Sequence, residues 1–249
     1  MSCTEERVAA YLRLGSAEAA AAELGVSRCT ILNAARAAGV SRPRGSPRRY
    51  RYDEAFFDSY TPAASYWAGF LAADGTLLLR GTARCIKLGL AAVDRAHVEA
   101  FLRCAGSDHP AVERSDGGYL GVAANISSRR WWDALGARFG VGPRKSLTLG
   151  PPPAEMPDDA AWHYARGYFD GDGTVRPDGT QLGVVGTQAL LAWLRDLWGS
   201  HHALSPHASI WRLCVSGPVL RALVPRLYAG STPDTRLARK YVRLARWLG

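Results

Sequence analysis

The sequence predicts an α+β protein made of two similar halves, preceded by a small all-helical unit. Three observations predict this fold class. First, residues 66–76 and 164–174 carry the same pattern, with Tyr, Gly, Asp, Gly and Thr at matching offsets. Second, each copy is followed by a similar order of strand-like and helix-like segments, as expected of a duplicated unit. Third, residues 4–40 contain only helix-like segments.

The N-terminal unit, residues 1–40, is predicted to contain three helices, marked by apolar residues at 8–14, by alanines at 17–24 and by a segment at about 28–38. Gly25 permits a turn before the third helix and Ser27 can cap it. This segment resembles the helix-turn-helix signature, in which the third helix enters a major groove. Its candidate DNA contacts are Arg28, Thr30, Asn33 and Arg36. An alanine-rich helical pair that binds another protein would have the same pattern.

Residues 41–58 are predicted to be a basic linker, because Pro, Gly and Ser interrupt regular structure. An extended basic arm can follow a phosphate backbone or lie in a minor groove. A solvated tether would have the same composition. The arginines expected to contact DNA are Arg42, Arg44, Arg48, Arg49 and Arg51.

Each half is predicted to fold in the order helix, two strands, helix, two strands, helix, the first half at 59–153 and the second at 154–249. Alternation of apolar and polar residues indicates the strands, and apolar residues at helical spacing indicate the helices. After the first motif, strands are expected at 76–80, 84–91, 112–114 and 119–126, and helices at 96–105 and 127–139. After the second, strands are expected at 174–176, 181–185, 207–210 and 211–216, and helices at 188–198, at 218–228 and after 240.

The repeated helix ends in Asp-Gly-Thr, at Asp74 and again at Asp172. We expect Gly75 and Gly173 to end the helices in the left-handed conformation. The partial negative charge at the C-terminal end of a helix disfavours a carboxylate. Two aspartates at equivalent positions therefore indicate a positive group that offsets the repulsion, and a divalent cation is the simplest candidate. Two helix caps without an ion are the alternative.

The chain is basic, with 31 Lys and Arg against 22 Asp and Glu and a formal net charge of +9. This favours a polyanionic partner, nucleic acid before a membrane surface. The five cysteines are scattered and include no Cys-x-x-Cys pair, which indicates a reducing compartment and no structural zinc site. No apolar run is long enough to cross a bilayer. We expect a cytoplasmic, DNA-associated protein without a small-molecule substrate.

The paired motifs resemble those of the LAGLIDADG homing endonucleases. Residues 67–75 read W-A-G-F-L-A-A-D-G and residues 165–173 read A-R-G-Y-F-D-G-D-G, with the two motif aspartates intact. Two motifs in one chain resemble the monomeric, pseudo-two-fold branch of the family. The departures from the family pattern are Trp67, Ala72, Ala165 and Arg166. Arg166 is the most unusual of them, and we expect it to point outward.

The resemblance implies an active site between two closely packed motif helices. The small residues that would allow the close approach are Gly69, Ala72, Ala73, Gly167 and Gly171. Asp74 and Asp172 would then lie together and each bind Mg²⁺, with Mn²⁺ or Ca²⁺ as substitutes in vitro. The resemblance leaves open whether the backbone at position 73 contributes a ligand.

The resemblance also implies roles for residues around this site. Lys145 and Lys240 would polarise water or stabilise phosphate charge, although plain phosphate contacts would explain them too. Asp94 matches a polar catalytic position, where Gly186 stands in the second half, so the two strands need not be cut equally fast. The sheets would form saddles in the major groove. Their candidate DNA contacts, any of which could instead serve solubility, are Arg80, Arg84, Lys87, Arg114, Asn125, Arg176, Gln181, Trp211 and Arg212, with Arg239 nearer the active site.

The leading hypothesis is therefore a monomeric, Mg²⁺-dependent endonuclease that cuts double-stranded DNA at a long asymmetric target. A non-catalytic DNA-binding regulator and an intron RNA maturase on the same scaffold are the alternatives. The two intact aspartates favour cleavage over both.

Overall fold

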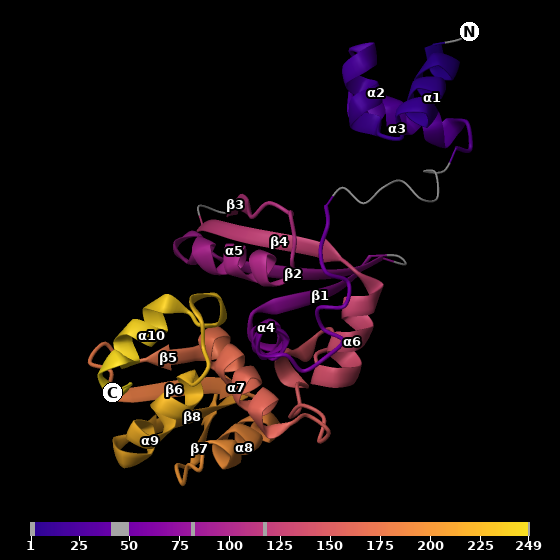
Figure 1. Ribbon diagram of the computed structural model, residues 1–249. Helices are drawn as coiled ribbons and strands as arrows, with labels where there is room; N and C mark the ends of the chain where they lie inside the picture. Colours follow the sequence, from indigo (N-terminus) through magenta and orange to yellow (C-terminus); the bar gives the residue numbers. More distant parts are fainter. Residues whose placement is uncertain (1–2, 41–49, 81–82, 117–118, 249) are drawn as a thin grey trace. The chain divides into compact units, whose positions relative to one another are not determined.

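The computed structural model describes residues 3–40, 50–80, 83–116 and 119–248 of the chain (Figure 1). The chain divides into two compact units, Met1–Arg49 and Tyr50–Gly249, each with its own hydrophobic cluster. Four of the arginines expected to contact DNA lie outside the described residues: Arg42, Arg44, Arg48 and Arg49. The side chain of Arg80 is not described either.

The N-terminal unit has the three predicted helices: α1 Cys3–Leu14, α2 Ala17–Leu24 and α3 Arg28–Ala37. The turn before α3 forms as its residues predict. Gly25 has φ = 63°, and the Ser27 hydroxyl accepts a hydrogen bond from the backbone N–H of Thr30. Ile31 of α3 is fully buried against alanines and a tyrosine of the other two helices. The unit therefore has a small core of its own.

The second unit has the predicted order in both halves, which confirms the α+β fold class. The first half contains α4 Pro62–Ala73, β1 Gly75–Arg80, β2 Ala83–Ala91, α5 Arg95–Cys104, β3 Val112–Asp116, β4 Tyr119–Ser127 and α6 Arg129–Phe139. The second half contains α7 Asp158–Asp172, β5 Gly173–Val175, β6 Gln181–Gly186, α8 Gln188–Leu197, β7 Leu204–His207, β8 Ile210–Ser216, α9 Gly217–Tyr228 and α10 Ala238–Leu244. The sheets have equivalent antiparallel orders, β1-β2-β4-β3 and β5-β6-β8-β7.

One predicted strand pair is displaced. The sequence predicts strands at 207–210 and 211–216, but β7 ends at His207 and β8 begins at Ile210. The turn falls at Ala208, which adopts a left-handed φ of 52°, and at Ser209. Alanine at a left-handed position is not a typical turn residue, and this is why the turn is invisible in the sequence.

The motif helices α4 and α7 pack side by side at the centre of the second unit, between the two sheets (Figure 1). A Cβ atom on Gly69 would lie 2.0 Å from the backbone oxygen of Tyr164, and one on Gly167 would lie 1.9 Å from that of Tyr66. Further along, a Cβ on Gly171 would lie 2.3 Å from the Cβ of Ala73. Only glycine permits this approach, as the small-residue pattern predicts.

The prediction of left-handed glycines at the motif ends is wrong. Gly173 has φ = −85° and ψ = 159°, and Gly75 is absent from the positive-φ glycines. Both positions start strands instead. A Cβ at Gly75 would lie 2.5 Å from the backbone oxygen of Leu71, and one at Gly173 would lie 2.3 Å from that of Phe169. The sharp change from helix to strand, not the sign of φ, requires these glycines.

Candidate active site and nucleic-acid interface

Asp74 and Asp172 lie at the adjoining C-terminal ends of α4 and α7. The two helix ends are close, since a Cβ on Gly171 would lie 3.5 Å from Oδ2 of Asp74. Burial and the negative charge of Asp74 raise the pKa of Asp172 to about 6. The Asp74 side chain is open to solvent, yet the surrounding protein atoms restrict its hydration and raise its pKa, against the opposing effect of Lys240 and Lys145. The structure thus brings the two predicted carboxylates into one electrostatic site.

Two lysines supply positive charge at these helix ends. The Nζ of Lys145 donates to the carbonyl oxygen of Ala73 at 2.9 Å, at the end of α4. The Nζ of Lys240 donates to the last carbonyls of α7, those of Phe169 at 2.8 Å, Asp170 at 2.7 Å and Gly171 at 3.1 Å. Each ammonium group offsets the partial negative charge at the C-terminal end of a helix. From the sequence alone, a metal ion was the predicted source of this positive charge.

The lysines differ in what they can still do. Lys240 is 2% exposed, and burial lowers its pKa to about 8. Its three donor hydrogens match its three carbonyl partners, so it acts on the carboxylates through its charge. Lys145 donates to one carbonyl and is only half-buried, which leaves donors for a phosphate or water. Burial also lowers its pKa, while Asp172 and Asp74 oppose this shift.

Asp94 and Arg239 join the two halves beside Asp74. The Nε of Arg239 lies 3.1 Å and 3.2 Å from the two carboxylate oxygens of Asp94. Asp94 precedes α5, and its side chain is 11% exposed, whereas that of Arg239 is 49% exposed. The guanidinium therefore keeps donors open to solvent.

Two hollows flank the helix ends, which we name after their motif aspartates. The Asp74 hollow has a volume of about 780 Å³, and its charged lining residues are Asp74, Lys87, Asp94, Arg114 and Arg239. The Asp172 hollow has a volume of about 300 Å³, and its polar lining residues include Lys145, Tyr168, Asp172 and Thr187. Each motif aspartate thus opens into its own hollow.

No protein-family model matches this chain, and no curated protein does. Its fold, however, matches solved structures. The homing endonuclease I-WcaI bound to its DNA recognition sequence is 12% identical, with a TM-score of 0.50 over 75% of this chain and 86% of that chain. The LAGLIDADG homing endonuclease I-GzeII in complex with its DNA target is 10% identical, with a TM-score of 0.50 over 76% and 89%.

The chain has the LAGLIDADG homing endonuclease fold. At these identities the match concerns the fold alone, and it confirms the resemblance given by the paired motifs. Within the described residues, no helix is long and apolar enough to cross a membrane.

The prediction for Arg166, the most unusual departure from the LAGLIDADG pattern, is wrong. Arg166 was expected to point outward, but it is fully buried. Its guanidinium donates to the carbonyl oxygens of Thr235 at 2.9 Å, Leu227 at 3.0 Å and Ala229 at 3.3 Å. It therefore ties α7 to the end of α9 and to the segment between α9 and α10. The guanidinium carbon also lies 5.4 Å from the ring centroid of Tyr66 of α4, whereas the close backbone contact with α4 is made by Gly167.

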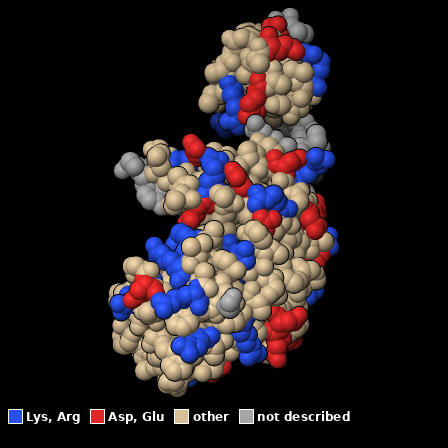
Figure 2. Space-filling model, turned by 60° about the vertical axis from the view of Figure 1, so that its left-hand side comes forward, with Lys and Arg blue, Asp and Glu red and all other residues tan. Residues whose placement is uncertain are grey.

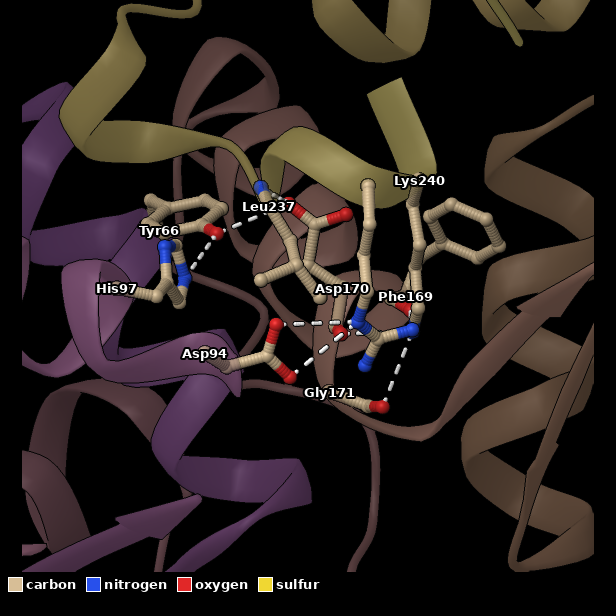
Figure 3. A network of polar contacts seen from close by, with 9 residues as sticks. Tyr66, Asp94, His97, Phe169, Asp170, Gly171, Leu237 and Lys240 are labelled. Carbon is tan, nitrogen blue, oxygen red and sulfur yellow. Dashed lines mark hydrogen bonds and ion pairs between the residues drawn. The ribbon is translucent and has the colours of Figure 1, made fainter. Parts of the chain in front are cut away.

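A buried network beside the motif aspartates was not predicted from the sequence (Figure 3). Asp170 is fully buried and accepts hydrogen bonds from the hydroxyls of Tyr66 at 2.9 Å and Tyr228 at 3.2 Å and from the backbone N–H of Leu237 at 2.7 Å. The Tyr66 hydroxyl also lies 2.9 Å from Nε2 of His97, whose pKa burial lowers to about 3. The neutral imidazole can donate this hydrogen bond. The available signal was a second aspartate in the motif, at the position where the first copy has Ala72.

The predicted DNA contacts of the first sheet divide between its two faces. Lys87 of β2 pairs with Asn125 of β4, and Arg114 of β3 pairs with Gly121 of β4. Gly121 and Asn125 are four residues apart in β4 and alternate residues of a strand share a face, so all three polar side chains lie on one face. This face lines the Asp74 hollow. Arg84 lies on the opposite face with buried Ile86, and its Nε is 3.7 Å from Asp133 of α6. Arg84 thus stands apart from the others.

The second sheet divides in the same way. Gln181 and Arg212 share one face, because Gln181 pairs with Ser216 and Val185 pairs with Arg212. Trp211 pairs with Gly186 on the other face and packs against the hydrophobic core. Arg176 is exposed beyond β5, with its guanidinium 3.4 Å from Asp178. In the face that Figure 2 shows, Lys and Arg side chains lie close together toward the lower left, with few Asp and Glu among them.

The remaining candidates outside the two sheets are exposed arginines, one exposed asparagine and Thr30, which is half-buried with its hydroxyl 2.8 Å from that of Ser27. Arg28, Asn33 and Arg36 are exposed on α3, where the Nε of Arg28 lies 3.0 Å from Glu18. Arg51 donates through Nε to Asp108 at 3.0 Å and is 88% exposed.

The donors at the helix ends fit a hard divalent cation. The described residues contain no group of three or more His, Cys, Asp or Glu side chains that could hold a metal ion. Mg²⁺ however uses one or two carboxylates and completes its shell with water and substrate phosphate. Asp74 and Asp172 supply those two carboxylates, and a cation between them would relieve the repulsion that raises the pKa of Asp172.

Proposed function

We propose that this chain is a site-specific endonuclease that hydrolyses both strands of double-stranded DNA as a monomer, in the cytoplasm, with a divalent cation, Mg²⁺. The observation that carries the proposal is the placement of Asp74 and Asp172 at adjoining helix ends between two sheets. Two structures of the same fold, I-WcaI and I-GzeII, hold DNA targets. The fold likeness supports the substrate class, and the two carboxylates support hydrolysis.

The open sheet faces would bind the DNA on either side of the helix ends. Lys87, Arg114 and Asn125 on the first sheet, and Gln181 and Arg212 on the second, carry donors suited to base edges and phosphates in the major groove. The exposed residues of α3 and the arginines between residues 41 and 51 would add contacts outside the sheets. Arg84 and Trp211 are left out of this proposal, because they lie on the helix-covered faces.

Asp74 and Asp172 would hold the cation. When bound, such a cation polarises a phosphoryl oxygen and acidifies water. Asp94 can accept a proton from water in the Asp74 hollow, and the free donors of Arg239 can bind a phosphate oxygen there. Lys145 can donate to phosphate in the Asp172 hollow, while Lys240 fixes the end of α7.

The test begins with selection of cleaved sites from a randomised DNA library incubated with the full chain and Mg²⁺. A single recovered target, cut with Mg²⁺ and intact with EDTA, supports the proposal. Asp74→Asn and Asp172→Asn should each lower cutting at least ~100-fold and leave binding intact. Asp196→Asn is the matched control, because Asp196 is exposed on α8 and pairs with its neighbour Arg195. Failure to cut any DNA with Mg²⁺ or Mn²⁺ would refute the proposal.

A DNA-binding regulator is the second candidate, favoured by the N-terminal unit. Its α3 presents Arg28, Asn33 and Arg36 to solvent after a well-formed turn. A regulator would bind one sequence tightly in EDTA and leave it uncut in every metal. Sites selected from the same library by binding in EDTA serve both tests, so one binding gel and one cleavage gel on that DNA distinguish the two functions.

A further inference from the structure

The turn between β5 and β6, residues 177–180, has one well-defined conformation. Gly179 has a left-handed φ of 67°, and its backbone N–H donates to the carbonyl oxygen of Arg176 at 2.9 Å. The Asp178 carboxylate accepts hydrogen bonds from the backbone N–H of Thr180 at 3.1 Å and from its hydroxyl at 2.8 Å. Two of the candidate DNA contacts flank this turn, Arg176 and Gln181.

The end of the chain holds this turn by its backbone. Residues 238–247 form α10 and a short 3-10 turn, and we name them the C-terminal segment. The helix of this segment packs against β5 (Figure 1). The indole Nε1 of Trp247 donates to the carbonyl oxygen of Gly179 at 2.7 Å. The guanidinium of Arg246 donates to the carbonyl oxygen of Asp178 at 3.1 Å. Two donors of the C-terminal segment thus fix two consecutive carbonyl groups of the turn.

The turn and the C-terminal segment are in close contact. A Cβ atom on Gly179 would lie 2.4 Å from the carbonyl oxygen of Arg243. Trp247 is itself held, because it packs against the hydrophobic core. The guanidinium carbons of Arg221 and Arg246 also lie 5.5 Å and 4.9 Å from its ring centroid, a distance at which a cation and an indole ring attract each other. The donor that meets the turn therefore has a fixed position.

The hairpin of β5 and β6 is held at its other end as well. β5 begins at Gly173, directly after Asp172 of α7. The C-terminal segment reaches this helix end through Lys240, whose Nζ donates to the last carbonyl groups of α7. One continuous stretch of the chain thus joins the end of the motif helix to the tip of the hairpin. A shift of the hairpin relative to α7 would break hydrogen bonds of this stretch.

A side chain that reads a base edge discriminates against the wrong base only if its backbone cannot move to accommodate that base. We propose that the C-terminal segment determines specificity, with Gly179 and Trp247 as positioning residues that fix the hairpin of β5 and β6. The two DNA contacts beside the turn, Arg176 and Gln181, then accept few base pairs. This deepens the proposed function and rests on its assignment of the open sheet faces to DNA.

The test measures the affinity of the full chain, in EDTA, for the DNA site selected by binding and for each single-base-pair variant of that site. The ratio of the two affinities gives the discrimination at each base pair. Gln181→Ala identifies the base pairs read by the hairpin, and Arg114→Gln identifies those read by the first sheet. Trp247→Phe keeps an aromatic ring but removes the donor, so it should lower discrimination ~2–10-fold at the hairpin base pairs, the range of one hydrogen bond. Discrimination at the base pairs of the first sheet should stay within about 2-fold, because distant sites act independently.

Gly179→Ala disturbs the same contact from the side of the hairpin and should lower discrimination at the same base pairs. Gly199→Ala is its matched control, because Gly199 has a similar φ of 59° but nothing within 4 Å of an added Cβ. Trp132→Phe is the control for the loss of an indole, since Trp132 packs against the core from α6 in the first half. Neither control should change any base preference.

The pattern of the loss separates positioning from a purely structural role. An equal loss of affinity for all sites, with unchanged discrimination, would overturn the inference, and so would a Gln181→Ala protein with wild-type base preferences. Either Trp247→Phe or Gly179→Ala suffices, so the test stands if one of them fails to fold. Because binding is measured, the result does not depend on cleavage. A protein that binds with the expected pattern but cuts no DNA would refute the proposed endonuclease and leave the inference in place.

Discussion

The folded protein disfavours the charged form of the Asp172 carboxyl group. Its pKa rises from 3.8 to about 6, first through burial and second through the charge of Asp74. The folded state therefore binds more protons than the unfolded state between these two values. By linkage, the free energy of unfolding falls as pH rises through this window, and the loss is complete above it.

Asp172→Asn should therefore stabilise the protein above about pH 6. A shift of this size corresponds to ~3 kcal/mol when unscreened, and partial solvent exposure reduces the expected gain to ~1 kcal/mol. The gain should vanish below pH 3.8, where the wild-type carboxyl is protonated in both states. Urea unfolding at several pH values measures it. Asp196→Asn, which removes an exposed carboxylate from the same half, should change stability by less than ~0.5 kcal/mol.

The same variant tests the cation by a route that needs no DNA. A cation that binds only the folded protein adds stability by mass action. Addition of Mg²⁺ should therefore raise the unfolding free energy of the wild type, and it should raise that of Asp172→Asn much less. Equal effects on both proteins would place the cation elsewhere.

Residues differ in how far the sequence alone could assign them. Asp74 and Asp172 were predictable, because a repeated charge at an unfavourable helix end is a local pattern. Asp170 and Arg166 were not, because the groups that satisfy them come from distant positions such as Leu237 and Thr235. A buried charge is explained by its partners, and one sequence does not show which segments meet.

At the scale of elements, the crossing of α4 and α7 fixes the distance between the two carboxylates. The helices touch backbone to backbone, with Gly69 against Tyr164 and Gly167 against Tyr66. Both contacts involve main-chain oxygens, which cannot rotate away as a side chain can. The relative position of Asp74 and Asp172 therefore depends on the absence of a Cβ atom at each of these glycines.

Gly69→Ala should cost at least ~3 kcal/mol or prevent folding, because the new Cβ would lie 2.0 Å from the Tyr164 oxygen. Gly136→Ala is the matched control. Gly136 lies inside α6 with nothing within 4 Å of an added Cβ, so the change should stabilise the protein by ~0.5–1 kcal/mol through helix propensity. Thermal or urea unfolding of both variants and the wild type measures these changes in the free energy of unfolding. A Gly69→Ala protein with wild-type stability would mean that the helices do not cross this closely.

Elements were the most predictable level, because helices and strands follow from the spacing of nearby residues. The order of all elements in both halves follows from the sequence. Arg84 and Lys87 stand three residues apart in β2, so alternation alone places them on opposite faces of the sheet. The sequence does not show which face the helices cover, because that depends on how the sheet packs against distant segments such as α6, where Asp133 lies 3.7 Å from Arg84.

At the scale of the whole molecule, the chain joins two units with separate cores. The first 49 residues carry eight arginines and four glutamates, and the repeat unit follows from Tyr50. The hydrophobic cluster of each unit draws on its own residues only. The unit from Tyr50 onward contains both motif aspartates and both hollows, so it holds every group assigned to the chemistry.

A chain of residues 50–249 should therefore still cut the target selected with the full chain, at the same phosphates, but should bind it more weakly. Each phosphate that an arginine neutralises adds ~0.9 to the log–log slope of affinity against salt concentration. Removal of the N-terminal unit should lower that slope by ~2–4, if about half of its arginines neutralise phosphates. DNA affinity measured at several salt concentrations gives this slope for both chains. Arg36→Gln in the full chain shows how much the loss of a single arginine changes it. An unchanged slope would make the N-terminal unit a protein-binding module, the alternative that its alanine-rich helices allow.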